Sequence, residues 1–210
     1  MKISECSFRD IDKKCVILKG EHVYSGAKKH MEERSYQAPV GVDATLCYCY
    51  IDAMAGLSFH FLCFANFITG KIDTECYERV LDAGTILIFR AGPDYDVSIF
   101  AGDTSLFHMR VEMVDESYYR DKNVLATRDI TLIDQLRNTC YPDDILALLY
   151  KDGLEPERPW VRLQKIENNR LYGILLNEPH QDFGISFYDN VTMDFLRHAD
   201  EVYAVICISS

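Results

Sequence analysis

Three residues of one expected strand could form a charged cluster. Apolar and polar residues alternate from Ser105 to Val114, and His108, Arg110 and Glu112 fall on the polar side. Successive side chains of a strand point to opposite faces, so this spacing predicts a strand with one solvated face. An imidazole, a guanidinium and a carboxylate together could bind a charged partner. The same set is also typical of an ordinary solvated sheet surface, which contributes little to stability.

A cysteine–histidine combination could carry out nucleophilic catalysis. Cys47 and Cys49 lie two positions apart, so they share one side of a strand, and a thiolate there would need His60 opposite it as a base. All three residues stand in apolar runs, where buried packing is the simpler interpretation. An enzymatic alternative nevertheless stays open. It is a small hydrolase or transferase with His60 or His108 as the base and a cysteine or aspartate as the nucleophile.

The last quarter of the chain adds three candidates for binding. Trp160 stands next to a proline-rich segment, where it could seal a junction between two domains or contact a ligand. Glu178 lies in an Asn-Glu-Pro break, where its carboxylate could cap a turn or contact a partner. His180 follows in a polar loop and could bind a ligand. These residues mark a candidate surface without fixing its chemistry.

The sequence contains no motif that fixes a reaction. It lacks a glycine-rich phosphate loop, a Gly-x-Ser-x-Gly elbow and a His-Glu-x-x-His pair. Asp94, Asp96 and Asp103 cluster near two turns but lack the spacing of a calcium loop, so turn formation explains them better. The sequence therefore predicts no cofactor and no metal, and it favours a protein without catalysis.

Hydrophobic periodicity places these residues on elements of two domains. Residues 1–152 are expected to form an α+β domain with an antiparallel sheet, and residues 153–159 a linker rich in proline and charge. Residues 160–210 are expected to form a small barrel, with Asn168 and Asn169 in a tight hairpin turn. The expected strands cover residues 45–51, 57–68, 85–89, 95–101, 105–114, 160–166, 171–176, 191–196 and 202–208. The expected helices cover residues 21–37, 73–83, 130–137 and 142–150.

The C-terminal part resembles a known family. The run 159–163 begins with Trp160-Val161, the run 171–179 has a Gly-x-Leu strand and ends in an Asn-x-Pro break, and a turn follows at 188–191. This pattern resembles the YegJ-like domains, a bacterial family of small β-barrels of unknown function. The family has Gly-Asp in the last turn, where this chain has Tyr188-Asp189. The resemblance implies an accessory module and no catalytic residues. We therefore expect an α+β fold followed by a small SH3-like β-barrel.

Composition and charge restrict the partner. Hydrophobic residues make up 48% and charged residues 26% of the chain, which is typical of a soluble globular protein. The net charge of -11 disfavours nucleic acid and anionic membranes, whose binding requires lysine and arginine. It is compatible with a basic protein partner, and it also serves solubility alone. The eight cysteines include no Cys-x-x-Cys pair, and the N-terminus has no apolar signal run, which favours a cytoplasmic setting.

Together these features favour a cytosolic bacterial protein-binding module without catalysis. One concrete form is an immunity-type inhibitor that masks a basic effector. A homodimer stays open as well, because both domains are expected to have exposed edge strands.

Overall fold

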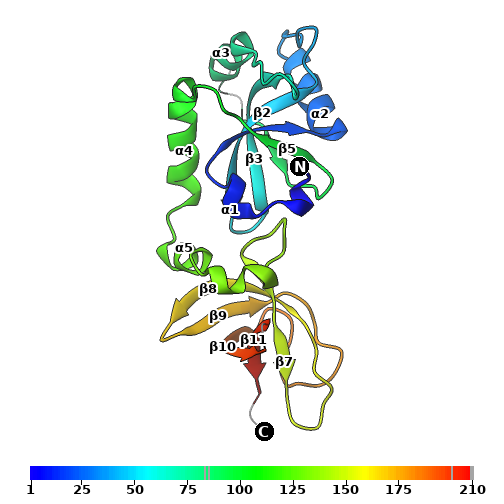
Figure 1. Cartoon of the computed structure of the whole chain (residues 1–210), viewed down its shortest axis with the longest axis vertical. Helices are drawn as coiled ribbons and strands as arrows, with labels where there is room; N and C mark the ends of the chain where they lie inside the picture. Colours follow the sequence, from blue (N-terminus) through cyan, green and yellow to red (C-terminus); the bar gives the residue numbers. More distant parts are fainter. Residues whose placement is uncertain (83, 85, 200, 209–210) are drawn as a thin grey trace. The chain divides into compact units, whose positions relative to one another are not determined.

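A computed structural model describes residues 1–82, 84, 86–199 and 201–208. The chain divides into two compact units, Met1–Tyr118 and Tyr119–Ser210, each with its own β-sheet (Figure 1). The division falls well before the linker expected at residues 153–159. The reason is that residues 144–150 pair with the C-terminal strands, which makes the expected linker an internal segment of the second unit.

The first unit is built on a five-stranded antiparallel sheet in the order β4-β3-β2-β1-β5. The hairpin expected at residues 45–68 is confirmed as β2 and β3, and these two strands are buried almost throughout. A strand that is apolar on both faces must be covered on both. The strands are β1 (Cys15–Lys19), β2 (Ala44–Asp52), β3 (Gly56–Ala65), β4 (Ile88–Arg90) and β5 (Asp96–Ile99).

Helices on different sides of this sheet provide that cover (Figure 1). The long helix α2 packs its buried Val23, Ala27 and Met31 toward β1 and β2. On the face that carries Tyr48, α4 holds the sheet through a 2.7 Å hydrogen bond from the Tyr48 hydroxyl to Asp115. The helices of this unit are η1 (Ile3–Glu5), α1 (Phe8–Ile11), α2 (Glu21–Glu32), α3 (Thr74–Asp82), η2 (Ser105–Phe107) and α4 (His108–Tyr118). The expected ends at residues 83 and 85 lie outside the described residues.

The second unit is a six-stranded sheet that curls into a half-barrel, in the order β6-β8-β9-β10-β11-β7. Its two edge strands are consecutive in the chain, separated only by Ala147. Gly173 lets β9 approach β8 closely, because a Cβ there would lie 2.5 Å from the Arg162 carbonyl oxygen. The elements are α5 (Lys122–Arg128), η3 (Thr131–Leu136), β6 (Asp144–Leu146), β7 (Leu148–Tyr150), β8 (Trp160–Glu167), β9 (Arg170–Leu175), β10 (Asn190–His198) and β11 (Glu201–Cys207).

Two ion pairs, one buried and one partly buried, fix α5 and β8 in this unit. The Asp143 carboxylate accepts two hydrogen bonds from Arg128, at 2.8 and 2.7 Å, and both side chains are almost fully buried. The Asp144 carboxylate likewise accepts two hydrogen bonds from Arg162, at 2.7 and 2.9 Å. Paired, doubly hydrogen-bonded charges are the form in which a protein interior accepts arginine.

Two sequence predictions were wrong. Residues 105–114 form helix rather than strand, and their inward residues Phe107, Arg110 and Val114 follow helical spacing. Because Arg110 is one of these inward residues, the sequence shows no continuous apolar stripe at helical spacing. Residues 142–150 form β6 and β7 rather than a helix. The acidic residues after Pro142 are typical of a helix start, but in the fold Asp143 and Asp144 accept hydrogen bonds from arginines in the two ion pairs.

Candidate functional site

The structure separates the three residues predicted to share a strand face. A helix has about 3.6 residues per turn, so Arg110 points away from His108 and Glu112. His108 and Glu112 are exposed one turn apart, whereas Arg110 is 8% exposed and donates a 3.2 Å hydrogen bond to the Val80 carbonyl oxygen. The predicted three-residue cluster is therefore wrong, and only its two outer members share a surface.

Arg110 instead faces the buried His60. The His60 side chain is 1% exposed, and within the described part of the chain its Nε2 has no hydrogen-bond partner. Burial, and then the positive charge of Arg110, lower the pKa of His60 to about 4. His60 is therefore a neutral imidazole at neutral pH and is closed to solvent. This position does not suit a base that must meet a substrate.

The cysteines of β2 do not meet that histidine either. Cys47 lies opposite Phe61 and Cys49 opposite Phe59, while His60 lies opposite Tyr48. Directly opposed residues share a face of the sheet, so the imidazole and both thiols are on opposite faces. Burial also raises the pKa of Cys47 to about 12, which keeps it a thiol. The geometry thus provides no cysteine–histidine pair on this hairpin.

The C-terminal candidates lie around one loop of the second unit. Asn177 accepts a 2.7 Å hydrogen bond from the Trp160 amide, and Glu157 accepts one of 2.8 Å from the His180 amide. Trp160 is half-buried at the start of β8 and stands at no domain boundary, because the expected linker is internal to this unit. Glu178 accepts a 2.7 Å hydrogen bond from the amide of Phe187, which fixes the distal part of the loop.

That fixed part presents two exposed aromatic rings, of Phe187 and Tyr188. Their exposed fractions are 50% and 60%, and their ring centroids lie 4.4 Å apart with the planes at 89°. Tyr188 has φ 71°, a left-handed conformation that is unusual for a bulky residue. Its amide donates to the Leu175 carbonyl oxygen at 2.9 Å, and Asp189 accepts from the Ser186 amide at 2.7 Å. The surrounding structure therefore enforces a strained backbone that exposes both rings.

The turn is also acidic. Segment 177–190 contains Glu178, Asp182 and Asp189 and no lysine or arginine of its own. One lysine from outside the segment, Lys151, donates to the carbonyl oxygens of Asp182 and Phe183, both at 3.3 Å. We call Phe187 and Tyr188, with Glu178 and Asp189 beside them in the loop, the aromatic turn. Sequence reasoning found Glu178 but missed the rings. The available signal was the pair Phe187-Tyr188 directly before Asp189-Asn190, because aspartate and asparagine favour turns.

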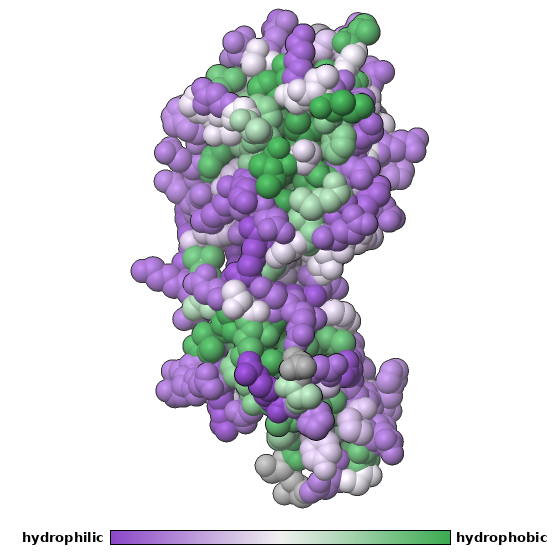
Figure 2. Space-filling model, viewed as in Figure 1, coloured by the Kyte–Doolittle hydropathy of each residue, from purple (hydrophilic) through white to green (hydrophobic). Residues whose placement is uncertain are grey.

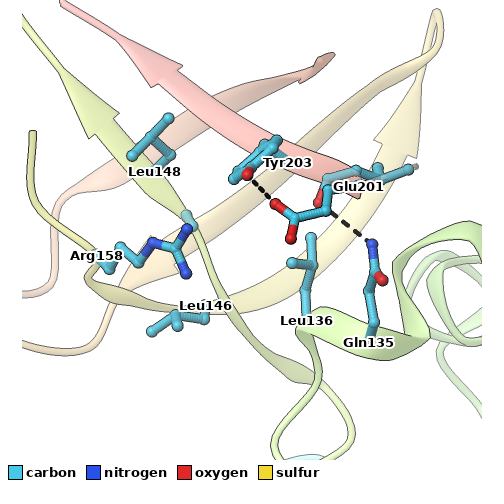
Figure 3. A pocket seen from close by; sticks show the side chains of 9 residues that line it. Gln135, Leu136, Leu146, Leu148, Arg158, Glu201 and Tyr203 are labelled. Atoms are coloured by element: carbon cyan, nitrogen blue, oxygen red, sulfur yellow. Dashed lines mark hydrogen bonds between the residues drawn. The ribbon is translucent and has the colours of Figure 1, made fainter. Parts of the chain in front are cut away.

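Hydrophilic residues cover most of the visible face of the molecule, with apolar groups between them (Figure 2). A separate hollow of about 210 Å³ lies in the second unit beside β6, β7 and β11 (Figure 3). Both apolar and polar side chains line it, and the polar groups contact one another. Arg158 lies over the Tyr203 ring at 5.7 Å, and the Tyr203 hydroxyl donates to Glu201. The hollow is smaller than the usual ligand pocket of about 300 Å³ or more.

Within residues 1–82, 84, 86–199 and 201–208, no group of three or more histidine, cysteine, aspartate or glutamate side chains is placed to hold a metal ion. None of the helices in that part of the chain is long and apolar enough to cross a membrane. Comparison with known proteins gave no match to a family model, a curated protein or a solved structure.

Proposed function

We propose that this chain is a non-catalytic protein-binding module. The observation that carries the proposal is the strained, exposed pair Phe187–Tyr188. Backbone strain of about 1–3 kcal/mol persists only where the structure enforces it, and it concentrates at functional positions. Exposed tyrosine and other aromatic side chains also contribute most of the energy of many protein interfaces. A rigid turn that offers two rings loses little entropy on binding.

The partner we propose is a basic protein. The carboxylates of Glu178, Asp182 and Asp189 lie in the same loop as the rings, and the whole chain carries a net charge of -11. Complementary charge speeds encounter and restricts the choice of partner. A cytoplasmic bacterial immunity-type inhibitor that masks a basic effector is one concrete form. We propose further that the curled sheet, whose two edge strands both come from residues 144–150, is an SH3-like barrel of a YegJ-like accessory module.

The test is a pull-down from lysate of the source organism with matched variants as bait. Tyr188→Gly removes one ring and relieves the left-handed strain, so we expect stability to rise by about 1 kcal/mol while the partner is lost. Phe187→Ala should lose the partner as well. Asn169→Gly is the control, since Asn169 (φ 62°) is also left-handed but lies in the β8–β9 hairpin.

The expected result is a basic protein retained by the wild type and by Asn169→Gly and released at high salt. Retention by Tyr188→Gly should be at least about tenfold lower, because a hot-spot ring contributes about 2 kcal/mol or more. Equal retention by all baits would refute the role of the aromatic turn. A partner that resists high salt would refute the charge-based part of the proposal.

A further inference from the structure

Helix α4 has exposed apolar side chains on its outer side. Its inward side contains the charged Arg110 together with the apolar Val114, while Met109 and Met113 are exposed. Amphipathic helices normally place the apolar stripe toward the core and the charges toward solvent. Arg110 donates a hydrogen bond inward to the Val80 carbonyl oxygen. The outward apolar residues are Leu106 of η2 and Met109 and Met113 of α4, with exposed fractions of 46%, 57% and 37%.

These three residues form one stripe, because they are spaced by three and four positions. We call the stripe the methionine face. Methionine is flexible and polarizable and is over-used on surfaces that bind apolar segments. Scattered exposed apolar residues need no explanation, but a contiguous apolar stripe indicates an interaction site. The stripe matches the anchor spacing by which an amphipathic helix is recognised.

The charge next to the stripe indicates which kind of helix would dock. Glu112 is exposed and lies beside the stripe, three positions after Met109, while the exposed Glu116 ends the stripe, three positions after Met113. An acidic residue that flanks an apolar seam favours a partner helix with lysine or arginine in the facing position. A second copy of this chain would add another net charge of -11, which opposes self-association.

We infer that the methionine face is a second docking surface, whose occupant is a basic amphipathic helix of a protein partner. The inference rests on the proposed function only in taking a basic protein as the partner. Its residues lie in the first unit, and none of them belongs to the aromatic turn of the second. The two surfaces can therefore be removed independently by substitution.

The test measures binding of a fluorescent synthetic helix with leucines at heptad a and d positions and lysines elsewhere. The full chain is titrated into this peptide, and anisotropy is recorded. Met109→Glu removes apolar surface but adds negative charge, so the two mechanisms predict opposite signs. Docking on the methionine face predicts binding at least about tenfold weaker. Non-specific charge attraction predicts equal or tighter binding, which would overturn the inference.

Two controls keep the result interpretable. Met54→Glu makes the same chemical change at another exposed methionine, in the β2–β3 connection, and should leave peptide affinity within about twofold of wild type. Glu112→Gln should weaken binding and reduce its salt dependence. Circular dichroism verifies that each variant is folded.

The outcomes separate this inference from the proposed function. Loss of the lysate partner in Tyr188→Gly, together with unchanged peptide binding in Met109→Glu, would overturn the inference and leave the function standing. Weaker peptide binding in Met109→Glu, with no dependence of the lysate partner on Tyr188, would leave the inference standing and overturn the proposed function. Concentration-dependent dimerisation of the wild type that Met109→Glu abolishes would assign the face to a second copy, and would overturn the proposed occupant.

Discussion

His60 is the residue at which burial most clearly controls charge in this protein. Its imidazole is 1% exposed in β3, and Arg110 adds a positive charge nearby, so protonation is opposed twice. Because the unfolded chain exposes both groups, the pKa of His60 returns on unfolding to about 6.5. The unfolded state therefore binds the proton more readily than the folded state.

This difference predicts a loss of stability on mild acidification. The contribution of neutral His60 to the free energy of unfolding is fully present above pH 6.5 and is lost as pH falls toward the folded pKa of about 4. Between about pH 7 and pH 5 the loss should be about 2 kcal/mol in the free energy of unfolding. Urea unfolding of the wild type and of His60→Gln at both pH values measures it. The variant should be less stable overall and less sensitive to pH, and an equal pH effect in both proteins would contradict the assignment to His60.

Residue roles that depend on local chemistry could be read from the sequence, and those that depend on position in space could not. Glu178 was expected to cap a turn or to contact a partner, and its carboxylate does accept from the Phe187 amide. The burial of His60 followed from its apolar run. Arg110 was placed on a solvated face, because nothing in the local pattern shows that α3 supplies a buried carbonyl for its guanidinium.

A buried ion pair joins two segments of the second unit. Asp143 and Arg128 join the segment before β6 to α5 with side chains only 4% and 6% exposed. Asp143→Asn leaves a buried guanidinium without its counter-charge, so we expect it to cost about 3 kcal/mol of unfolding free energy. Chemical denaturation measures this cost. The matched control is Glu167→Gln, which breaks the exposed pair with Lys165 and should cost about 1 kcal/mol or less. Similar costs for both variants would refute the role of burial.

At the scale of elements, long runs of apolar and β-branched residues were a reliable signal, whereas the alternation at residues 105–114 and the acidic cluster after Pro142 were misleading. The β2–β3 hairpin and the four strands β8 to β11 were expected and are confirmed. The segment 142–150 was expected as a helix because its proline and aspartates are typical of a helix N-terminus. In the fold the same aspartates bind arginines from α5 and β8, which are tertiary partners that no local window contains.

The whole molecule consists of two units whose sheets share no strand in the part of the chain that the structure describes. The second unit has its own core, which includes Ile145 and Leu149 of β6 and β7 together with residues of the four later strands. A fragment with residues 119–210 should therefore fold alone and unfold in one cooperative transition.

A fragment that begins at the boundary expected from the sequence should fail to fold. Residues 153–210 lack β6 and β7, so both edges of the half-barrel would be open and Arg162 would lose the carboxylate of Asp144. Unpaired edges and an uncompensated arginine both favour aggregation or unfolding. Amide dispersion in NMR spectra of the two fragments distinguishes the cases. Dispersed spectra from both would place β6 and β7 outside the folding unit, because four strands would then suffice for the half-barrel. A disordered fragment 119–210 would instead mean that the first unit is needed to hold the second in its fold.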